Sequence, residues 1–342
     1  MMKRYLFYIT ENYSFEILRP LQKEILVRGG VVYWLVSGKN VSLGSFHANE
    51  KTLNSIDDAV KYNPDACFIP GNLIPNFIPG LKVQVFHGLE WKKKGHFQVR
   101  GFFDLYCTHG KATTSRFKTL ASKHGYFDVI ETGWPKIDPL FNTPSAQYFE
   151  TKKTTILYAP TFSPKLTSAP DLFDEMRNFS LSGNYNCLVK FHPKMDNEWV
   201  KKYQALNNDS FKVVSSSDIN QLFQTADILV SDTSSVIGEF ALLGKPVVTY
   251  KNSKPGDYLI NIESPSKLVS AIDNASSPSS ALKLAIKHYT DDLHPYKDGQ
   301  SSSRILDAVE KILKDGKDAK KRKPLNIFRS FKLRKKLNYW KI

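Results

Sequence analysis

The sequence predicts two consecutive α/β domains, each built on a doubly wound parallel sheet. Three observations carry this prediction. Short apolar runs of strand length alternate with longer segments of helical spacing, which is typical of βαβ units. A polar, proline-containing stretch at residues 142–154 interrupts the alternation, which then restarts. A chain of 342 residues is also long enough for two domains that each bury a core.

The first domain is expected over residues 1–145 and opens with an apolar strand at 6–10. Residues 15–28 carry apolar side chains at helical spacing and are followed by two glycines, so they predict a helix. Residues 31–36 are rich in β-branched and aromatic side chains and predict the next strand. Further buried strands are expected at 66–69, 83–86, 105–108 and 129–132.

The second domain is expected over residues 153–300, and residues 301–342 are expected to form a C-terminal helix and a basic, aromatic tail. Its elements are strands at 156–159, 187–191, 211–214, 228–231 and 247–250, and helices at 218–225 and 234–243. Ligands bind beyond the carboxyl ends of the strands in such sheets. We therefore expect the functional site in a cleft between the two domains.

The composition excludes several classes of protein. The 3 cysteines are far apart and form no CxxC pair, so neither a disulfide framework nor a zinc site is predicted, and a reducing compartment fits best. The first apolar run is too short for a signal peptide, and no apolar stretch approaches the roughly 20 residues that cross a bilayer. These features predict a cytoplasmic protein.

The net charge of +15 is concentrated at one end of the chain. Residues 311–342 contain 13 Lys or Arg and 2 Asp or Glu, which leaves a net charge of only +4 for the remainder. Basic groups interleaved with aromatic ones suit an anionic membrane surface, so we expect attachment to the inner face of the plasma membrane. A disordered basic tail is the plainer interpretation. No nucleic-acid motif accompanies the charge, so no nucleic-acid partner is expected.

The most informative local motif is a buried strand that ends in Asp232 and runs through Thr233, Ser234 and Ser235 into a helix. Helix N-termini expose unpaired N–H groups and the positive end of the helix dipole, and both attract phosphate. Serine hydroxyls add further donors. The motif therefore predicts a phosphate site, while the plainer interpretation is that a serine only caps the helix.

Two other strands deliver a histidine to their carboxyl ends. In the second domain His192 is flanked by lysines, among them Lys194, and can donate to a phosphate oxygen, although a lone histidine is more often structural. In the first domain His87 is the candidate general base, because a hydroxyl nucleophile must lose its proton as it attacks. Gly88 after it permits a tight turn.

Three smaller features border the expected cleft. Lys92 and Lys93 follow the His87 turn and either attract an anionic substrate or form a solvated loop. Thr161 ends the first strand of the second domain. The turn at residues 133–138, which contains Lys136 and Asp138, follows the last strand of the first domain and is either a ligand contact or a structural turn around a packed tryptophan.

In this order the motifs resemble those of the CDP-glycerol glycerophosphotransferase family, the glycerol- and ribitol-phosphate transferases of teichoic-acid and capsule assembly. The resemblance covers about residues 83–252. The matching pieces are Phe86-His87-Gly88-Leu89, Gly133-Trp134-Pro135 with Asp138, Tyr158-Ala159-Pro160-Thr161, His192-Pro193 and Asp232-Thr233-Ser234-Ser235. The chain departs from the family pattern at Phe86, Leu89, Glu90 and Thr233, where the family has tryptophan, threonine, proline and tyrosine.

The resemblance implies a GT-B fold and in-line attack of an acceptor hydroxyl on the β-phosphorus of CDP-glycerol or CDP-ribitol, with CMP leaving. It implies that His87 is the base and that His192, Ser234 and Ser235 neutralise the pyrophosphate. Glu239 is implied to hold the ribose, and Thr161, Lys194, Asp232 and Thr233 to lie on the donor side. Gly88, Lys92, Lys93, Lys136 and Asp138 are implied on the acceptor side.

The acceptor is expected to be lipid-linked or an oligosaccharide, and no metal or other cofactor is expected. Three alternatives stay open. They are a glycosyltransferase of the same fold that uses a UDP- or CMP-sugar, a sugar-nucleotide epimerase that needs no acceptor, and a non-catalytic binding protein.

Overall fold

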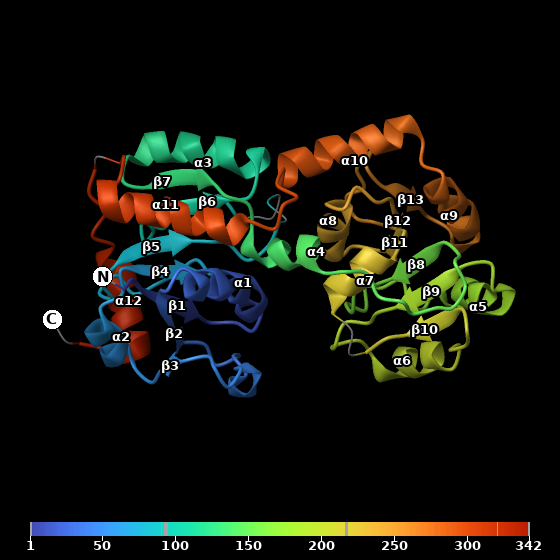
Figure 1. Cartoon of the computed structure of the whole chain (residues 1–342), viewed down its shortest axis with the longest axis horizontal. Helices are drawn as coiled ribbons and strands as arrows, with labels where there is room; N and C mark the ends of the chain where they lie inside the picture. The colour runs from blue at the N-terminus through green and yellow to red at the C-terminus, as the bar shows by residue number, and fades with distance from the viewer. Residues whose placement is uncertain (1, 90, 92–94, 216–217, 320, 341–342) are drawn as a thin grey trace. The chain divides into compact units, whose positions relative to one another are not determined.

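The computed structural model describes residues 2–89, 91, 95–215, 218–319 and 321–340 (Figure 1). The chain forms two compact units, of which the second is Leu140–Asp292. The first unit combines Met1–Pro139 with Leu293–Ile342. The sequence prediction assigned residues 293–300 to the second domain and 301–342 to a C-terminal helix and a basic, aromatic tail, whereas the structure groups both segments with the first unit.

The first unit contains a seven-stranded sheet of order β3-β2-β1-β4-β5-β6-β7, in which every neighbouring pair is parallel. The strands are β1 (Arg4–Ile9), β2 (Val31–Val36), β3 (Thr52–Leu53), β4 (Ala66–Ile69), β5 (Leu81–Gln84), β6 (Leu105–Thr108) and β7 (Asp128–Glu131). The strand order reverses between β1 and β4. A doubly wound parallel sheet was the sequence prediction for this unit, and it is confirmed.

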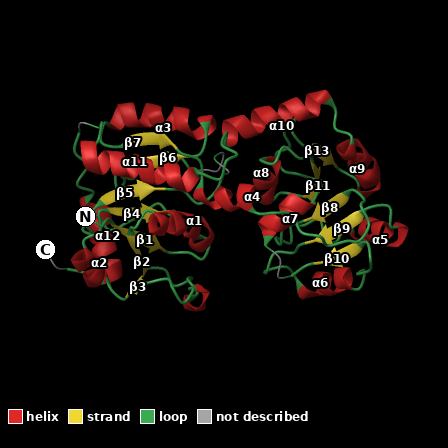
Figure 2. Ribbon diagram, viewed as in Figure 1, coloured by secondary structure: helices red, strands yellow, loops and turns green. Residues whose placement is uncertain are grey.

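Helices cover both faces of this sheet (Figure 2). They are α1 (Ser14–Val27), α2 (Ile56–Tyr62), α3 (Lys111–His124), α11 (Ser301–Asp315) and α12 (Ile327–Leu337), with 3-10 turns at Leu43–Ser45 and Pro135–Ile137. Helices α1 and α11 pack side by side on one face. Phe117 of α3 and Leu333 of α12 join an apolar cluster with Leu6 and Tyr8 of β1. Because side chains of a strand alternate between faces, Leu6 and Tyr8 point to the same face of the sheet.

The second unit has a six-stranded parallel sheet of order β10-β9-β8-β11-β12-β13, which reverses between β8 and β11. The strands are β8 (Thr155–Tyr158), β9 (Asn186–Val189), β10 (Phe211–Val213), β11 (Ile228–Ser231), β12 (Val247–Tyr250) and β13 (Ile260–Ile262). The helices are α5 (Phe173–Ser182), α6 (Asn197–Gln204), α7 (Ile219–Thr225), α8 (Val236–Ala241) and α9 (Leu268–Ser276), with a 3-10 turn at Pro265–Lys267. Here too the predicted sheet is confirmed.

The chain passes between the units twice, along α4 (Asp138–Asn142) and at the end of α10 (Ser280–Leu293). The element bounds differ from the sequence predictions by a few residues. The strand expected at 83–86 ends earlier, because Phe86 adopts a left-handed backbone with a φ of 59° that no strand accommodates. The helix expected at 234–243 is shorter, since Ser235 precedes α8.

The basic segment after α11 is anchored to the first unit. The buried carboxylate of Asp104 accepts hydrogen bonds from Lys317 Nζ at 2.8 Å and Lys323 Nζ at 2.7 Å. Asp128 accepts from the backbone N–H groups of Asp318 and Ala319. Part of the positive charge of the tail therefore stabilises the fold. No helix in the described part of the chain is long and apolar enough to span a bilayer.

Asp104 should be a point of weakness in the first unit. Its carboxylate also accepts the backbone N–H of Lys82 at 2.9 Å, so Asp104→Ala leaves that buried donor without its partner. We expect a loss of about 2 kcal/mol in the free energy of unfolding, measured by urea denaturation. Asp307→Ala removes an exposed ion pair with Arg28 and should cost less than about 1 kcal/mol.

The loss should also depend on pH. Burial raises the pKa of Asp104, but the charge of Lys323 and hydrogen bonds from Lys317 and Lys323 outweigh it and hold the pKa below its ordinary value. A depressed pKa stabilises the fold above the unfolded value and loses that effect as the pH falls through the folded one. The difference in stability between the unmodified protein and Asp104→Ala should therefore shrink as the pH falls below about 4. A difference that stays constant as the pH falls well below that value would contradict this role of Asp104.

Candidate active site

In the second unit, polar side chains gather where the strand order reverses. Strands β8 and β11 are neighbours, and they end at Tyr158 and Ser231. The loop from Ala159 to Thr161 and the turn that starts at Asp232 therefore leave the sheet side by side. Ser231 Oγ donates to the carbonyl of Ala159 at 2.7 Å and links the two strand ends. This edge is where open parallel sheets bind ligands.

The carboxylate of Asp232 lies beneath these loops and is 0% exposed. It accepts the backbone N–H of Thr161 at 3.0 Å, and the N–H and Oγ of Ser168 at 2.9 and 3.0 Å. Burial raises the pKa of this carboxyl although these bonds oppose the shift. Asp232 was predicted to bind the donor, and in the structure its side chain fixes the loop that carries Thr161.

The hydroxyl groups of the turn after Asp232 have different surroundings. Thr233 Oγ1 accepts the backbone N–H of Ser253 at 3.1 Å. Ser234 Oγ lies 3.5 Å from the N–H of Val236, which is a long contact, and Ser235 is exposed and makes no side-chain cap to α8. Capping therefore does not account for Ser235. Glu239 is buried within α8.

Asn252 is a residue of this edge that the sequence analysis missed. It follows β12, and its Nδ2 donates to the backbone carbonyl of Asp232 at 2.6 Å. Its Oδ1 accepts the backbone N–H of Lys254 at 2.9 Å. Asn252 therefore joins the loop after β12 to the serine turn. Its position just past a buried strand was the signal that could have identified it.

His192 lies on the loop after β9, next to β8. Its Nδ1 lies 3.1 Å from the backbone N–H of Lys194 and must accept from it. A neutral imidazole that accepts at Nδ1 carries its proton on Nε2, so we assign the Nε2–H tautomer. Burial and the charge of Lys194 lower the pKa of His192, which keeps the ring neutral at pH 7. His192 is thus a hydrogen-bond donor on an exposed loop.

His87 is held in the opposite way in the first unit. Its Nδ1 lies 3.2 Å from the carbonyl oxygen of Pro70, which follows β4 at the reversal of strand order. A carbonyl only accepts, so Nδ1 carries the proton and Nε2 keeps a lone pair. The ring of Tyr13 stacks on His87 with centroids 5.4 Å apart. His87 is exposed, and in this tautomer it can accept a proton at Nε2.

The backbone around His87 explains its exposure. Phe86 is buried in a left-handed conformation, which is costly for a residue with a Cβ. Its ring stacks on His96 at 5.2 Å, and its carbonyl accepts from Trp134 Nε1 at 3.4 Å. The turn that was expected of Gly88 therefore falls on Phe86. Lys92, Lys93 and Glu90 lie outside the described residues.

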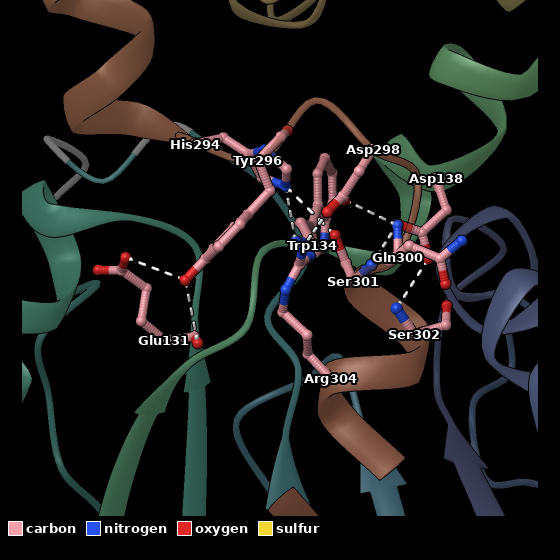
Figure 3. A network of polar contacts seen from close by, with 10 residues as sticks. All are labelled: Glu131, Trp134, Asp138, His294, Tyr296, Asp298, Gln300, Ser301, Ser302 and Arg304. Atoms are coloured by element: carbon pink, nitrogen blue, oxygen red, sulfur yellow. Dashed lines mark hydrogen bonds and ion pairs between the residues drawn. The ribbon is translucent and has the colours of Figure 1, made fainter. Parts of the chain in front are cut away.

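Figure 3 shows the contacts of the turn at residues 133–138. The backbone N–H of Trp134 donates to His294 Nε2 at 2.9 Å, and His294 Nδ1 donates to the carbonyl of Tyr296 at 2.8 Å. Gly133 has a φ of 82°, and an added Cβ would lie 2.4 Å from Ser301 Oγ. The turn is therefore packed against the returning C-terminal segment, and Trp134 is buried within it.

The same contacts give Asp138 a different role from the one expected. Its carboxylate is buried and accepts the backbone N–H groups of Ser301 and Ser302 at 2.8 and 2.7 Å, at the start of α11 (Figure 3). Burial raises its pKa. Asp138 thus ties the first turn of α11 to the end of the first segment, a contact that its predicted place on the acceptor side did not include. Lys136 Nζ lies 3.5 Å from Glu16 Oε2.

The described residues contain no group of three or more His, Cys, Asp or Glu side chains arranged to hold a metal ion. The first unit offers a proton acceptor at His87, and the second unit offers a hydrogen-bond donor at His192 and the exposed hydroxyl group of Ser235. Two doubly wound units with polar side chains where each strand order reverses define the GT-B class of nucleotide-dependent enzymes.

Comparison with known proteins identifies the family within this class. A family model described as CDP-Glycerol:Poly(glycerophosphate) glycerophosphotransferase matches residues 101–311, more than half of the chain. The chain therefore belongs to this family of transferases, as its motifs predicted.

Individual relatives of this chain are also teichoic acid primases and polymerases. A teichoic acid glycerol-phosphate primase of Bacillus subtilis (strain 168) is 30% identical over 263 residues, which are 65% of this chain and 67% of the primase. A teichoic acid poly(ribitol-phosphate) polymerase of Bacillus spizizenii is 28% identical over 212 residues, which are 53% of this chain and 33% of the polymerase. The match thus spans about two thirds of the first relative and one third of the second.

Solved structures confirm the fold. The wall teichoic acid polymerase TagF superposes with a TM-score of 0.62 at 17% identity, over 91% of this chain and 88% of the TagF chain. A putative UDP-N-acetylglucosamine 2-epimerase from Listeria monocytogenes gives a TM-score of 0.66 at 12% identity, over 94% and 99% of the two chains. At these identities the likeness establishes the GT-B fold alone.

His294 should make stability pH-dependent. Burial lowers its pKa to about 4, although its hydrogen bond to Tyr296 opposes the shift. Between about pH 6.5 and 4 the unfolded chain therefore binds a proton that the folded chain does not, so stability falls as the pH falls. His294→Ala should reduce this slope by up to about 1.4 kcal/mol per pH unit in urea denaturation.

The matched control is His288→Ala, which removes an exposed histidine of α10. It should leave the slope as in the unmodified protein. An equal slope in the protein without His294 would show that this imidazole does not titrate on unfolding as described.

Proposed function

We propose that this chain transfers glycerol phosphate or ribitol phosphate from a CDP-activated donor to a hydroxyl of a lipid-linked or saccharide acceptor. The product would belong to a cell-surface polymer, a teichoic acid or a capsule, and CMP would be released. Membership of the glycerophosphotransferase family and the named primase and polymerase relatives support the reaction. The observation that carries the mechanism is the contrast between the partners of the two Nδ1 atoms, a carbonyl oxygen at His87 and a backbone N–H at His192, from which we assign opposite tautomers.

The proposed step is attack of the acceptor oxygen on the β-phosphorus of the donor. A bond forms between that oxygen and phosphorus, and the bond from phosphorus to the CMP oxygen breaks with its electron pair. The acceptor proton goes to His87, whose Nε2 lone pair is free because Nδ1 donates to Pro70. General-base catalysis of this kind typically contributes about 10²- to 10⁴-fold.

On the donor side, charge grows on the phosphate oxygens as CMP leaves. His192 would donate from Nε2, with the hydroxyl groups of Ser234 and Ser235 as further donors and Lys194 as a nearby cation. Asp232 would act indirectly, since its carboxylate holds the Thr161 loop, and Thr233 through its bond to the loop after β12. Glu239 remains our candidate for the residue that binds the ribose of the donor.

On the acceptor side, Gly88 adjoins the base. An added Cβ at Gly88 would meet no atom within 4 Å, which leaves room for an acceptor hydroxyl beside His87. Lys92, Lys93 and Lys136 are the proposed cations for an anionic acceptor.

The reaction is tested by incubating the chain with CDP-glycerol, CDP-ribitol and UDP-sugars and measuring CMP and UDP release. We expect CMP release that needs an acceptor. His87→Ala should lower kcat by about 10²-fold or more, and His192→Ala by about 10²-fold, because each loses one group used in the transition state. His288→Ala is the control and should keep full activity.

Other products would indicate a different function. UDP release with an acceptor would favour a glycosyltransferase, and a converted sugar nucleotide without acceptor would favour an epimerase. No CMP from any CDP-polyol would contradict the proposed function.

We further propose that the C-terminal helix docks this enzyme on the inner face of the plasma membrane. In α12, Leu333 and Ser330 face the core, while Phe328 and Phe331 are 85% and 56% exposed. The same helix carries exposed cations at Arg329, Lys332, Lys335 and Lys336. Aromatic rings with neighbouring cations suit an anionic bilayer, where each cation contributes about 1 kcal/mol.

Docking is tested by sedimentation with vesicles of phosphatidylglycerol and phosphatidylcholine. The chain should bind these and not pure phosphatidylcholine, and binding should weaken as salt increases. The double change Phe328→Ser and Phe331→Ser should weaken binding by at least about tenfold, because each buried ring contributes more than about 1 kcal/mol.

Leu181→Ser is the matched control, since it removes an exposed apolar side chain of α5 in the other unit. Equal binding to neutral vesicles, or loss of vesicle binding to competing RNA at constant salt, would contradict the membrane role.

A further inference from the structure

Phe162 is a large apolar side chain at the candidate site to which neither the motifs nor the proposed reaction assigns a role. It follows Thr161, whose backbone N–H donates a hydrogen bond to Asp232. This bond fixes the position of the backbone directly before Phe162. Phe162 is 38% exposed. The centroid of its ring lies 4.3 Å from that of His192, and the planes are inclined by 27°, which is a stacked arrangement. An exposed phenylalanine at a polar edge calls for an explanation.

The explanation lies in how weakly the ring of His192 is held by its described hydrogen bonds. One hydrogen bond is described for the ring, from the N–H of Lys194 to Nδ1. A single bond on an exposed loop leaves the imidazole able to rotate about its two side-chain torsions. A flat ring against one face removes most of those orientations. It keeps the one in which Nδ1 meets the Lys194 N–H and Nε2 is turned away from it.

Lys194 completes a set of three side chains. Its Nζ lies 5.8 Å from the centroid of the Phe162 ring, within the range of a cation–π contact. Phe162 therefore contacts both the imidazole and a cation that were expected at the donor phosphate. The ring does not hydrogen-bond to phosphate itself, so its contribution would come through these neighbours.

We propose that Phe162 is a positioning residue, which stacks on His192 and holds its Nε2–H in the direction from which it donates to the substrate. The stacking and the fixed tautomer stand without any assumption about the substrate. The donation to a phosphate oxygen rests on the proposed function. A second effect is electrostatic. Burial and Lys194 lower the pKa of His192, and Phe162 covers one face of that ring.

The competing explanation is that Phe162 contacts the ligand directly, for instance by stacking on its base. The two explanations differ in one respect. A positioning residue acts through His192 and loses its effect when His192 is absent, whereas a ligand contact keeps its effect.

The first experiment needs no substrate. The full chain is titrated by NMR, following the imidazole signals of His192, which are assigned by their loss in His192→Ala. In Phe162→Ala the pKa of His192 should rise toward its ordinary value, and the ring nitrogen shifts should show a mixture of tautomers. Phe162→Tyr should restore both. Leu166→Ala removes another exposed apolar side chain of the same loop and is the matched control.

The second experiment measures CMP release from CDP-glycerol. Phe162→Ala should lower kcat about tenfold with little change in the KM for donor, because misplacing a catalytic group slows the reaction more than binding. Phe162→Tyr should recover most of the rate, and Phe162→Leu, which keeps apolar bulk without a flat ring, should not. In the His192→Ala background, Phe162→Ala should cause no further loss.

Two results would overturn the proposal. One is an unchanged pKa and tautomer of His192 in Phe162→Ala. The other is the same loss of rate from Phe162→Ala with and without His192, especially as a raised KM. If the unmodified chain releases no CMP from CDP-polyols, the proposed function fails, and the NMR titration still decides whether Phe162 positions His192.

Discussion

The second unit depends on a carboxylate that water does not reach. Asp232 stands at the end of β11 and binds three donors from the loop that follows β8. Without this carboxylate, the backbone at Thr161 and Phe162 would lose the bond that holds it in place. The N–H group of Thr161 would then have no partner at the end of a buried strand. Asn252 binds the backbone carbonyl of the same residue from the next strand. One buried acid therefore fixes the loops that carry the candidate donor site, which explains why an aspartate at this point need not touch the substrate.

The two histidines show how a single backbone contact can decide chemistry. His87 faces a carbonyl oxygen and His192 faces an N–H group, each through Nδ1. The same side chain is thereby a proton acceptor in one unit and a hydrogen-bond donor in the other. Each ring also has an aromatic neighbour, Tyr13 or Phe162. Neither arrangement needs an acidic partner of the kind that orients histidine in many hydrolases.

The C-terminal segment packs back onto the first unit and contributes hydrogen bonds and ion pairs to it. These contacts also involve the turn at residues 133–138, which the resemblance had placed on the acceptor side. Asp138 caps α11, and His294 binds the backbone of Trp134. Lys317 and Lys323 share Asp104. The resemblance had placed Asp138 on the acceptor side, and the charge pattern had predicted a basic tail that docks on a membrane or is disordered. Both bind the C-terminal segment to the first unit, and the membrane surface proposed for α12 consists of tail residues that remain exposed.

The sequence by itself determined the fold class, the family and the strand ends that carry polar side chains. Apolar periodicity reports burial, and strands buried on both faces read as continuous apolar runs. His87, His192 and the turn at Asp232 were therefore found from local pattern. Only the tertiary structure decided which groups each of them contacts. The sites of Asp232 and Asp138 look equally suited to a ligand in sequence, yet their partners lie 64 and 163 residues away. The tautomers of the histidines depend on Pro70 and on a backbone N–H, which sequence composition does not encode. Local spacing predicts where a side chain emerges, and hydrogen bonds that form only in the folded chain decide which groups it contacts there.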